Sequence, residues 1–405
     1  MGFINKEGEQ VENRPVAETL RGTDQTTEAS KVPVARLRYH GSLRQLFGIH
    51  IVNILLSICT LGIYSFWGKT RIRRYMTSHL TLQKDRLEYT GTGKELFIGF
   101  LKALLIYLPL IIAMQIPFLN LFLFPIFFGM ISLAVFLALR YRLGRTRWRG
   151  IRFSLRGSIK TYLWLAIKRT FFNIISIGFK IPKSDIIKWS YIANHMQYGE
   201  EKFTYQGDHK KIFKTHLITA LICFLLVGVV FPATIIANVE SSTVMEEITT
   251  SSQTSIQTSQ PDENPQHLIV SVDSKQTDTK QMVDILINFV IPFYGLLLLS
   301  VAARLWYHAA LWQEKFRGLR LGNIRFKMKL TGLDLVKLYG GNILIIIFTL
   351  GLGKPWAIQR TLTTFTSKLK IGGDLEALNV KQAEAIKQGG MGDALAADVG
   401  FDMGF

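Results

Sequence analysis

Two glycine-rich stretches place a lysine where a phosphate-binding loop would have one. They are Gly91-Thr92-Gly93-Lys94 and the GLGK of residues 351–354. A Walker-type loop needs another glycine five places before the glycine of its GK pair, and a Ser or Thr directly after the lysine to bind magnesium. Both stretches lack that glycine, and Glu95 and Pro355 follow their lysines. Neither stretch therefore predicts nucleotide binding, and no cofactor is expected.

The histidines and carboxylates show no catalytic or metal-binding pattern. None of the eight histidines belongs to an HExxH motif or to a cluster with Cys or carboxylates at ligand spacing, so no metal site is predicted. His50 lies in an apolar run three residues before Asn53, where it could pack helices or relay a proton. Asp284 and Asp334 are expected at helix ends. Without a nucleophile, metal ligands or an acid–base pair, the sequence predicts no catalytic residues and no enzyme.

A motif that occurs twice is the clearest internal pattern. Residues 59–71 read CTLGIYSFWGKTR and residues 348–360 read FTLGLGKPWAIQR. In each copy an Asn, a Thr, a Trp and a Ser are separated by 7, 7 and 11 positions: Asn53, Thr60, Trp67 and Ser78, then Asn342, Thr349, Trp356 and Ser367. A degraded middle copy, SIGFKIPKS at residues 176–184, has Lys183 in place of the Trp. These three units predict duplicated structure around a pseudosymmetric centre.

The residue types in this motif suit the edge of a membrane. Asparagine can bond backbone groups at a helix break, glycine permits a tight turn, and tryptophan prefers the lipid–water interface. Two interpretations stay open. Either these residues pack and anchor helices, or the asparagines and threonines line a solute route and the two asparagines face one cavity. The candidate residues are Asn53, Thr60, Gly62, Trp67, Asn342, Thr349, Gly351 and Trp356.

Basic residues gather beside the apolar runs of the chain. Much of the formal charge of +19 comes from residues 69–74, 140–156 and 315–329. Basic segments beside membrane spans mark the cytoplasmic side and attract anionic lipid headgroups. Membrane lipid is therefore the predicted partner, with a small solute as a second, and nucleic acid is not expected. The candidate lipid contacts are Arg71, Arg73, Arg74, Arg149, Arg152, Arg317 and Arg320.

Apolar runs of about 20 residues predict membrane-spanning helices. The clearest are Phe97–Ile116, Phe118–Leu139, Leu217–Ala237 and Met282–Ala303. The share of hydrophobic residues, 48%, supports a polytopic membrane protein. Residues 239–281 are rich in Ser, Thr and Gln, with seven acids against two lysines, and predict a flexible loop outside the cytoplasm.

The repeated units have basic residues on both flanks, so each is expected to dip into the membrane and return or to lie at its surface. The predicted fold is an all-α integral membrane protein, a polytopic helical bundle with internal duplication. It has two transmembrane hairpins and three interfacial or re-entrant units. The stretches LRYHG, IRFSLRG and NIRFKMKLTG predict short strands or turns on the cytoplasmic face.

The chain thus divides into alternating units and hairpins. The predicted segments are a disordered cytoplasmic tail (1–35), repeat unit 1 (36–95), hairpin 1 (96–147), a degraded repeat unit 2 (148–210), hairpin 2 with the external loop (211–310), repeat unit 3 (311–370) and a second disordered tail (371–405). Both termini are expected in the cytoplasm.

The stretches TLGIYSFWGKTR, TLGLGKPW, YIANHMQYGEEKFTYQG and WRGIRF resemble the YjgN-type bacterial inner-membrane proteins, over roughly residues 35–370. The resemblance implies a multi-pass protein of the bacterial cytoplasmic membrane. Because the family's biochemical function is unassigned, it implies no catalytic residues.

Two functions follow as hypotheses. The first is a transporter, channel or facilitator for a small solute, which the duplicated hairpins and paired polar motifs favour. The second is a non-transporting scaffold that organises the envelope and binds anionic lipid through a cytoplasmic basic belt.

Overall fold

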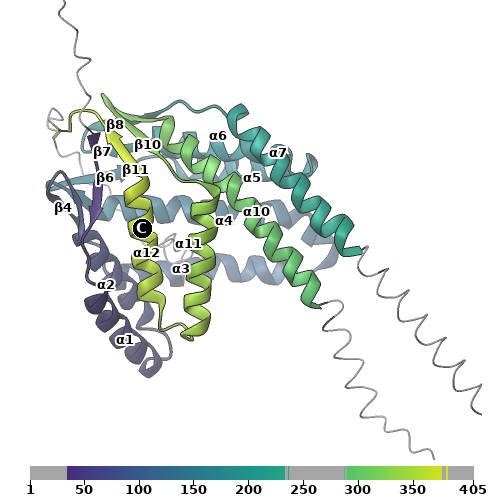
Figure 1. Ribbon diagram of the computed structural model, residues 1–405, viewed down its shortest axis with the longest axis horizontal. Coiled ribbons are helices and arrows are strands. Elements are labelled where there is room, and N and C mark those ends of the chain that lie inside the picture. Colours follow the sequence, from purple (N-terminus) through teal and green to yellow (C-terminus); the bar gives the residue numbers. More distant parts are fainter. Residues whose placement is uncertain (1–33, 233–235, 237–286, 288–289, 376–379, 382–405) are drawn as a thin grey trace, which may run out of the picture. The chain divides into compact units, whose positions relative to one another are not determined.

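Short β-strands alternate with pairs of helices along the chain (Figure 1). The computed structural model describes residues 34–232, 236, 287, 290–375, 380 and 381, and contacts divide the chain into Met1–Pro33 and Val34–Phe405. The strands are β1 (Val34–Ala35), β2 (Leu37–Tyr39), β3 (Leu80–Leu82), β4 (Asp85–Tyr89), β5 (Thr146–Trp148), β6 (Ile151–Leu155), β7 (Met196–Tyr198), β8 (Glu201–Tyr205), β9 (Leu319–Leu321), β10 (Ile324–Met328) and β11 (Leu369–Gly372). The helices are α1 (Leu43–Cys59), α2 (Ser65–Ser78), α3 (Gly93–Ala113), α4 (Pro117–Arg145), α5 (Ile159–Ile175), α6 (Ile181–Asn194), α7 (Lys210–Phe224) with its π-helical continuation η1 (Leu225–Val230), α10 (Ile291–Arg317), α11 (Gly332–Phe348) and α12 (Lys354–Lys368).

The eleven strands form one antiparallel sheet that nearly closes into a ring. Its strand order is β1-β11-β10-β9-β8-β7-β6-β5-β4-β3-β2, so the two edge strands are consecutive in sequence and only Arg36 separates them. Val34 of β1 lies opposite Gly372 of β11, and Leu37 of β2 lies opposite Leu82 of β3. The first strand segment therefore joins the end of the sheet to its beginning. We call this barrel-like sheet the β ring.

The β ring has two different rims. On one rim, tight turns at residues 83–84, 149–150, 199–200 and 322–323 join the strands in pairs. Gln83 and Lys84 have φ values of 49° and 71°, as type I′ hairpin turns require. On the other rim, each of β2, β4, β6, β8 and β10 leads into a pair of helices that returns to the next strand.

The prediction of an all-α polytopic bundle is wrong, because the β ring organises the described chain. Each strand has only two to five residues, which is too short to give a clear period-2 pattern. Pairs of helices also separate the strand pairs, so the sequence shows no meander. The predicted short strands in LRYHG, IRFSLRG and NIRFKMKLTG are confirmed as β2, β6 and β10.

One face of the β ring is apolar and carries the core. Leu87 pairs across the sheet with Trp148, and Phe203 pairs with Leu321. Helices cover this face: Tyr89, which ends β4, packs in one cluster with helical residues of α2, α3 and α4. Larger clusters join the other strands to α4, α5, α6, α10, α11 and α12. Burial of these side chains holds the helix pairs at fixed places around the ring.

Four helices are long and apolar enough to cross a membrane. They are Gly93–Ala113, Phe118–Arg145, Lys210–Val230 and Ile291–Arg317. They overlap the four predicted spans and form two long hairpins, α3–α4 and α7–α10. The predicted external loop, residues 239–281, lies outside the described residues. The two tails fall largely outside them, although Leu375 and Val380 join the core.

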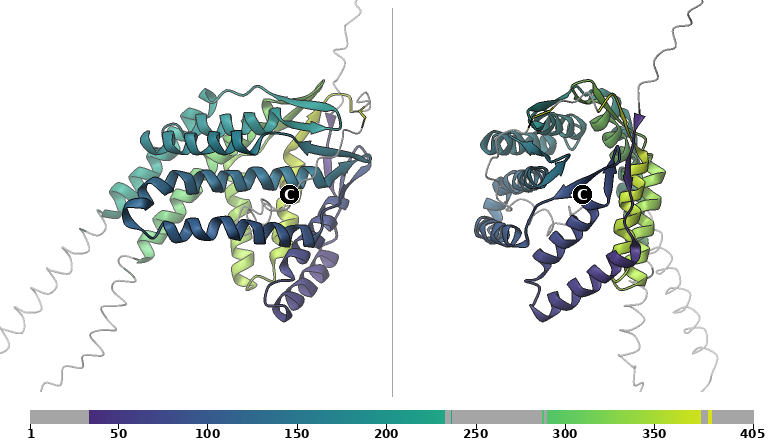
Figure 2. Two further views of the ribbon diagram at one scale, coloured as in Figure 1. Left: turned by 180° about the vertical axis from the view of Figure 1, so that it is seen from behind. Right: turned by 90° about the vertical axis from the view of Figure 1, so that its left-hand side faces the viewer.

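The three repeated sequence units form three short helical hairpins: α1–α2, α5–α6 and α11–α12 (Figure 2). In each hairpin a 17-residue helix is followed by a helix of 14 or 15 residues. The middle hairpin has the same form although its sequence motif is degraded. The unit boundaries remain predictions.

Candidate functional site in the short hairpins and on the basic face

The turn between the two helices has the same geometry in all three short hairpins. In the first one, Leu61 and Gly62 have φ values of 49° and 89°, and the Gly62 N–H donates to the carbonyl of Ser57 (2.7 Å). Thr60 Oγ1 donates to the Leu56 carbonyl (2.7 Å) and accepts from the Tyr64 N–H (2.9 Å). The other two turns repeat the positive φ values and the hydroxyl bonds at Ser176, Ile177 and Gly178 and at Thr349, Leu350 and Gly351. Thr60 and Thr349 therefore fix turns.

The two asparagines of the motif bind within their own hairpins. Asn53 Nδ2 donates to the Gly68 carbonyl (3.2 Å), and Asn342 Nδ2 donates to the Ala357 carbonyl (3.4 Å) and Thr361 Oγ1 (3.0 Å). Both side chains are buried. Among the described residues, the structure does not bring these asparagines to one cavity. Their geometry matches the interpretation in which they pack helices.

The tips of the short hairpins are apolar and exposed. Leu61, Ile177 and Leu350, which occupy the same position in the three turns, are 95%, 88% and 93% exposed. Trp67 and Trp356, six residues further along the chain, are also exposed. Large apolar side chains exposed at three equivalent tips are typical of surfaces that meet lipid or another apolar partner.

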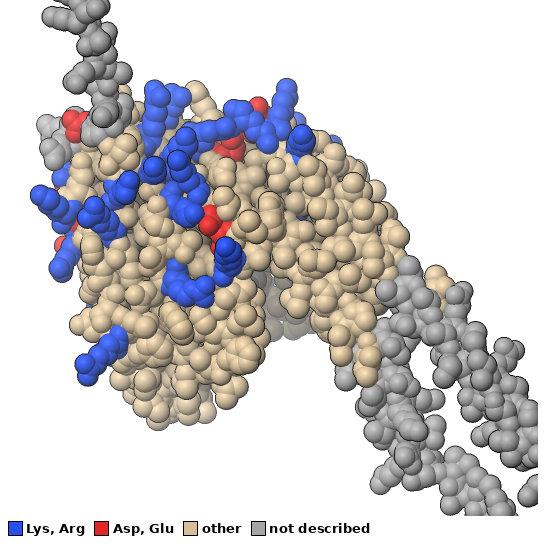
Figure 3. Space-filling model, viewed as in Figure 1, with Lys and Arg blue, Asp and Glu red and all other residues tan. Residues whose placement is uncertain are grey.

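The face of the β ring opposite the core is basic. Arg147 lies directly opposite Arg152, Arg320 opposite Arg325, and Lys327 opposite Lys370. Like charges at opposed positions repel, although Glu88 of β4 lies opposite Arg147 on its other side. We call this surface the basic face; its cations are Arg38, Arg86, Arg147, Arg152, Lys202, Arg320, Arg325, Lys327 and Lys370. Figure 3 shows Lys and Arg gathered over the strands and the adjacent helix ends, away from the hairpin tips.

Arg152 and Arg320 belong to the basic face, but the other predicted lipid contacts lie elsewhere. Arg71, Arg73 and Arg74 lie on α2, where Arg73 is buried and Arg74 donates to the Gly91 carbonyl (3.2 Å). Two arginines are held by carboxylates, since Arg149 pairs with Asp85 and Arg317 pairs with Glu314.

The sequence analysis missed a polar cluster between α6, α7 and α10. Asp185 accepts a hydrogen bond from the Tyr307 hydroxyl (2.7 Å) and lies 3.4 Å from Lys188 Nζ. Nearby, Arg304 Nη1 lies 3.0 Å from Nδ1 of His216, whose Nε2 is 3.1 Å from the Gly178 carbonyl. Arg304 follows directly on an apolar run, which was the signal in the sequence.

His50 lies against the turn of the third hairpin. Burial is the main cause that lowers the pKa of its imidazole, the Gly351 carbonyl acts in the opposite direction, and Lys354 lowers the pKa further. Its Nε2 is buried and has no hydrogen-bond partner among the described residues. His50 thus packs α1 against α12, two helices that ring closure brings together. No group of metal-binding side chains occurs within the described residues.

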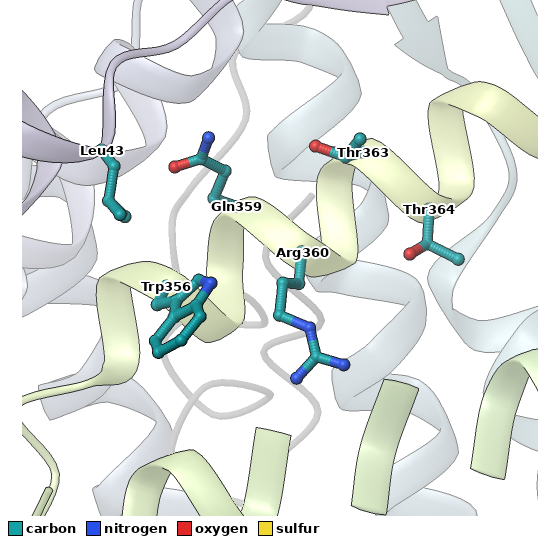
Figure 4. A pocket seen from close by; sticks show the side chains of 6 residues that line it. All are labelled: Leu43, Trp356, Gln359, Arg360, Thr363 and Thr364. Carbon is teal, nitrogen blue, oxygen red and sulfur yellow. The ribbon is translucent and has the colours of Figure 1, made fainter. Parts of the chain in front are cut away.

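An open cavity of about 270 Å³ lies at this junction (Figure 4). We call it the seam pocket, because it lies where the β ring closes. Its lining residues are Leu43, Trp356, Gln359, Arg360, Thr363 and Thr364. Of the motif residues, only Trp356 lines it.

A sequence model of the family described as "Bacterial protein of unknown function (DUF898)" matches residues 34–398. The chain is also similar to proteins named "Inner membrane protein YjgN". The protein of Escherichia coli (strain K12) is 28% identical over 36% of this chain and 37% of its own length, and that of Salmonella typhimurium is 31% identical over 32% and 33%. The matches thus span about a third of the curated relatives. No solved structure matches the chain.

Proposed function

Because the chain belongs to the DUF898 family of bacterial proteins of unknown function, we propose that it is a multi-pass protein of the bacterial cytoplasmic membrane that binds and organises anionic phospholipid. In this proposal the hairpins α3–α4 and α7–α10 span the membrane. The three short hairpins insert their apolar tips into one leaflet. The basic face lies toward the headgroups of the cytoplasmic leaflet, and both termini are cytoplasmic.

Two sets of observations support the membrane location. The curated relatives are named inner membrane proteins, and four described helices are long and apolar enough to span. Each long hairpin would cross the membrane twice, and every strand lies at the same end of its helices. The whole β ring would therefore lie on one side of the membrane. The clustering of Lys and Arg on the ring favours the cytoplasmic side.

The basic face is the observation that carries the lipid-binding proposal. Within it, cations face cations across three pairs of neighbouring strands, and Glu88 lies opposite Arg147, so the face as a whole carries an excess of positive charge. Anionic headgroups would supply the missing charge, at about 1 kcal/mol for each Lys or Arg near the surface. Attraction of this kind weakens as salt is added.

The test compares how spin-labelled phosphatidylglycerol and phosphatidylcholine associate with the reconstituted full chain. The wild-type protein should prefer phosphatidylglycerol at low salt and lose much of the preference at high salt. The combined change Arg325→Gln, Lys327→Gln and Lys370→Gln should reduce the preference several-fold. Glu88→Gln removes a carboxylate opposite Arg147 and should increase it slightly. Equal association of both lipids at low salt, or an unchanged preference in the triple variant, would contradict the proposal.

The polar cluster around Asp185 favours a second candidate, a transporter or facilitator for a small solute. Arg304, His216 and Tyr307 lie on helices of a hairpin long and apolar enough to span, where charged side chains often mark a solute path. This candidate requires no preference for anionic lipid.

A further inference from the structure

Around the β ring, the first residue of a helix repeatedly meets an indole of the preceding hairpin. Gly93 begins α3 beside Trp67 of α2, and a Cβ on this glycine would lie 2.6 Å from the indole Cγ. Gly332 begins α11 beside Trp306 of α10, and its Cβ would lie 2.5 Å from the indole. In both places glycine lets the helix start pack directly on the ring system.

At the seam the equivalent residue is not glycine. The helix that follows α12 around the ring is α1, which begins at Leu43. Trp356 occupies the same place in α12 that Trp67 occupies in α2, seven residues after the threonine of the turn. Leu43 and Trp356 both line the seam pocket, so an open cavity takes the place of the glycine–indole contact of the first site.

The lining of the seam pocket suits a headgroup that carries a phosphate and hydroxyls. Its polar groups are a guanidinium, a side-chain amide, two threonine hydroxyls and an indole N–H, and no carboxylate lines it. Arg360 Nη2 donates to the Lys337 carbonyl (3.3 Å), which uses one of the five N–H donors of the guanidinium. Gln359 Oε1 is fully buried, so the hydroxyls of Thr363 and Thr364 are the groups of the lining that can bond to ligand hydroxyls.

The size and position of the pocket favour a headgroup over a whole lipid. About 270 Å³ is slightly below the usual range for a complete small-molecule ligand. Trp356 is half exposed at its edge, and the apolar tip of the third hairpin, with Leu350 and Leu352, lies a short way along the chain. Acyl chains could follow that tip while the headgroup occupies the cavity.

We propose that the seam pocket binds the glycerophosphate headgroup of an anionic phospholipid, with Arg360 on the phosphate and the hydroxyls of Thr363 and Thr364 bonding to headgroup hydroxyls. The inference rests on the proposed function, because it assumes that this end of α12 lies at the membrane surface. A soluble glycerol phosphate carries the same chemistry and is the alternative source. The basic face attracts headgroups in general, whereas the seam pocket selects one.

The test titrates the full chain in neutral detergent with dihexanoyl phosphatidylglycerol by calorimetry. Arg360→Gln should weaken binding at least tenfold. Arg71→Gln is the matched control, because Arg71 is the same number of residues from Thr60 as Arg360 is from Thr349 and does not line the pocket. It should change the affinity less than twofold. Thr364→Phe, which keeps the charge and fills the cavity, should weaken binding as Arg360→Gln does.

Three outcomes would overturn the inference. Equal losses in the Arg360 and Arg71 variants would mean that only net charge matters. Equal affinity for dihexanoyl phosphatidylcholine would remove the headgroup selectivity, and equal affinity for glycerol phosphate would identify a site for a soluble anion. The spin-label experiment reports on the proposed function separately. If that function is wrong, the reconstituted protein shows no preference for phosphatidylglycerol, whether or not Arg360 is present.

Discussion

Asp334 shows how a single side chain can join the two helices of a short hairpin. It accepts from the Thr331 N–H (2.9 Å) and hydroxyl (2.8 Å), while the Asp334 N–H donates to Thr331 Oγ1, which completes a capping box at the start of α11. Lys368 Nζ, at the end of α12, lies 3.0 Å from the same carboxylate. One residue thus caps one helix and holds the end of its neighbour.

We expect Asp334→Asn to lower the stability of the protein by about 0.5–2 kcal/mol, the usual cost of a lost cap. The hydrogen bond from the Thr331 backbone is the largest cause that lowers the pKa of Asp334 below its ordinary value of 3.8, and Lys368 adds to it. The stabilisation is therefore fully present above about pH 4 and is lost as the pH falls through the lowered pKa. Thermal unfolding of both proteins from pH 7 to pH 3 measures it, with the difference narrowing only below about pH 4.

Thr331→Ala provides the control for this prediction. It removes the partner in the capping box, so the double variant should lose less stability than the sum of the single variants. Additive losses, or a difference that is the same at pH 3 and pH 7, would contradict the role assigned to Asp334.

At the scale of the element, the short hairpin is a structural motif that occurs three times. Its turn places a large apolar residue at the tip and a glycine with positive φ directly after it. Below the turn, Gly68, Ser184 and Ala357 occupy one position of the second helix, where a small residue allows close helix contact. The middle hairpin has the same motif with a different hydrogen bond. There Ser184 Oγ donates to Asn173 Oδ1 (2.6 Å), whereas in the other two hairpins an asparagine side chain donates to a backbone carbonyl of the second helix.

Gly62→Ala should destabilise the first hairpin by about 1–2 kcal/mol, because an L residue is strained at φ 89° although no atom lies within 4 Å of its Cβ. Gly48→Ala is a control that should change the stability in the opposite direction. Gly48 lies inside α1 with nothing within 4 Å of its Cβ, so this change should stabilise the helix by about 0.5–1 kcal/mol. Thermal unfolding distinguishes them, and shifts of the same sign would contradict the assigned turn geometry.

At the scale of the whole β ring, four tight turns share one rim and the helix pairs leave from the other. If the long hairpins span the membrane, all four turns must lie on the same side of it. In the proposed arrangement, the charge of the basic face predicts that this side is the cytoplasm.

Cysteine labelling tests this arrangement in intact spheroplasts. In a Cys59→Ala, Cys223→Ala background, single cysteines at Lys84, Glu200 and Asn323 should resist a membrane-impermeant maleimide until the cells are lysed. A cysteine at Ser259, in the predicted external loop, should react at once. Labelling of one turn position but not another in intact cells would mean that the turns are not on one side.

The sequence predicted the four long apolar helices and the likeness of the three short hairpins because each rests on a local signal, such as a long apolar run or the Asn-Thr-Trp spacing. It did not predict the β ring, whose strands are joined by pairings such as that of Val34 with Gly372, at opposite ends of the described chain. Asp185 was missed for the same reason: its partner Tyr307 lies on another helix far along the chain. The seam pocket depends on ring closure, so no local pattern could reveal it.

The closure of the ring also has a consequence for synthesis on the ribosome. The strand segment that is translated first pairs with β3 early, but its other partner, β11, follows every helix pair. Until β11 emerges, the nascent sheet has two open edges, and open edges readily pair with strands of other chains. If the long helical hairpins span the membrane as proposed, they enter it during this interval and hold the growing sheet at its surface, so that insertion protects the unfinished ring from aggregation until its last strand arrives.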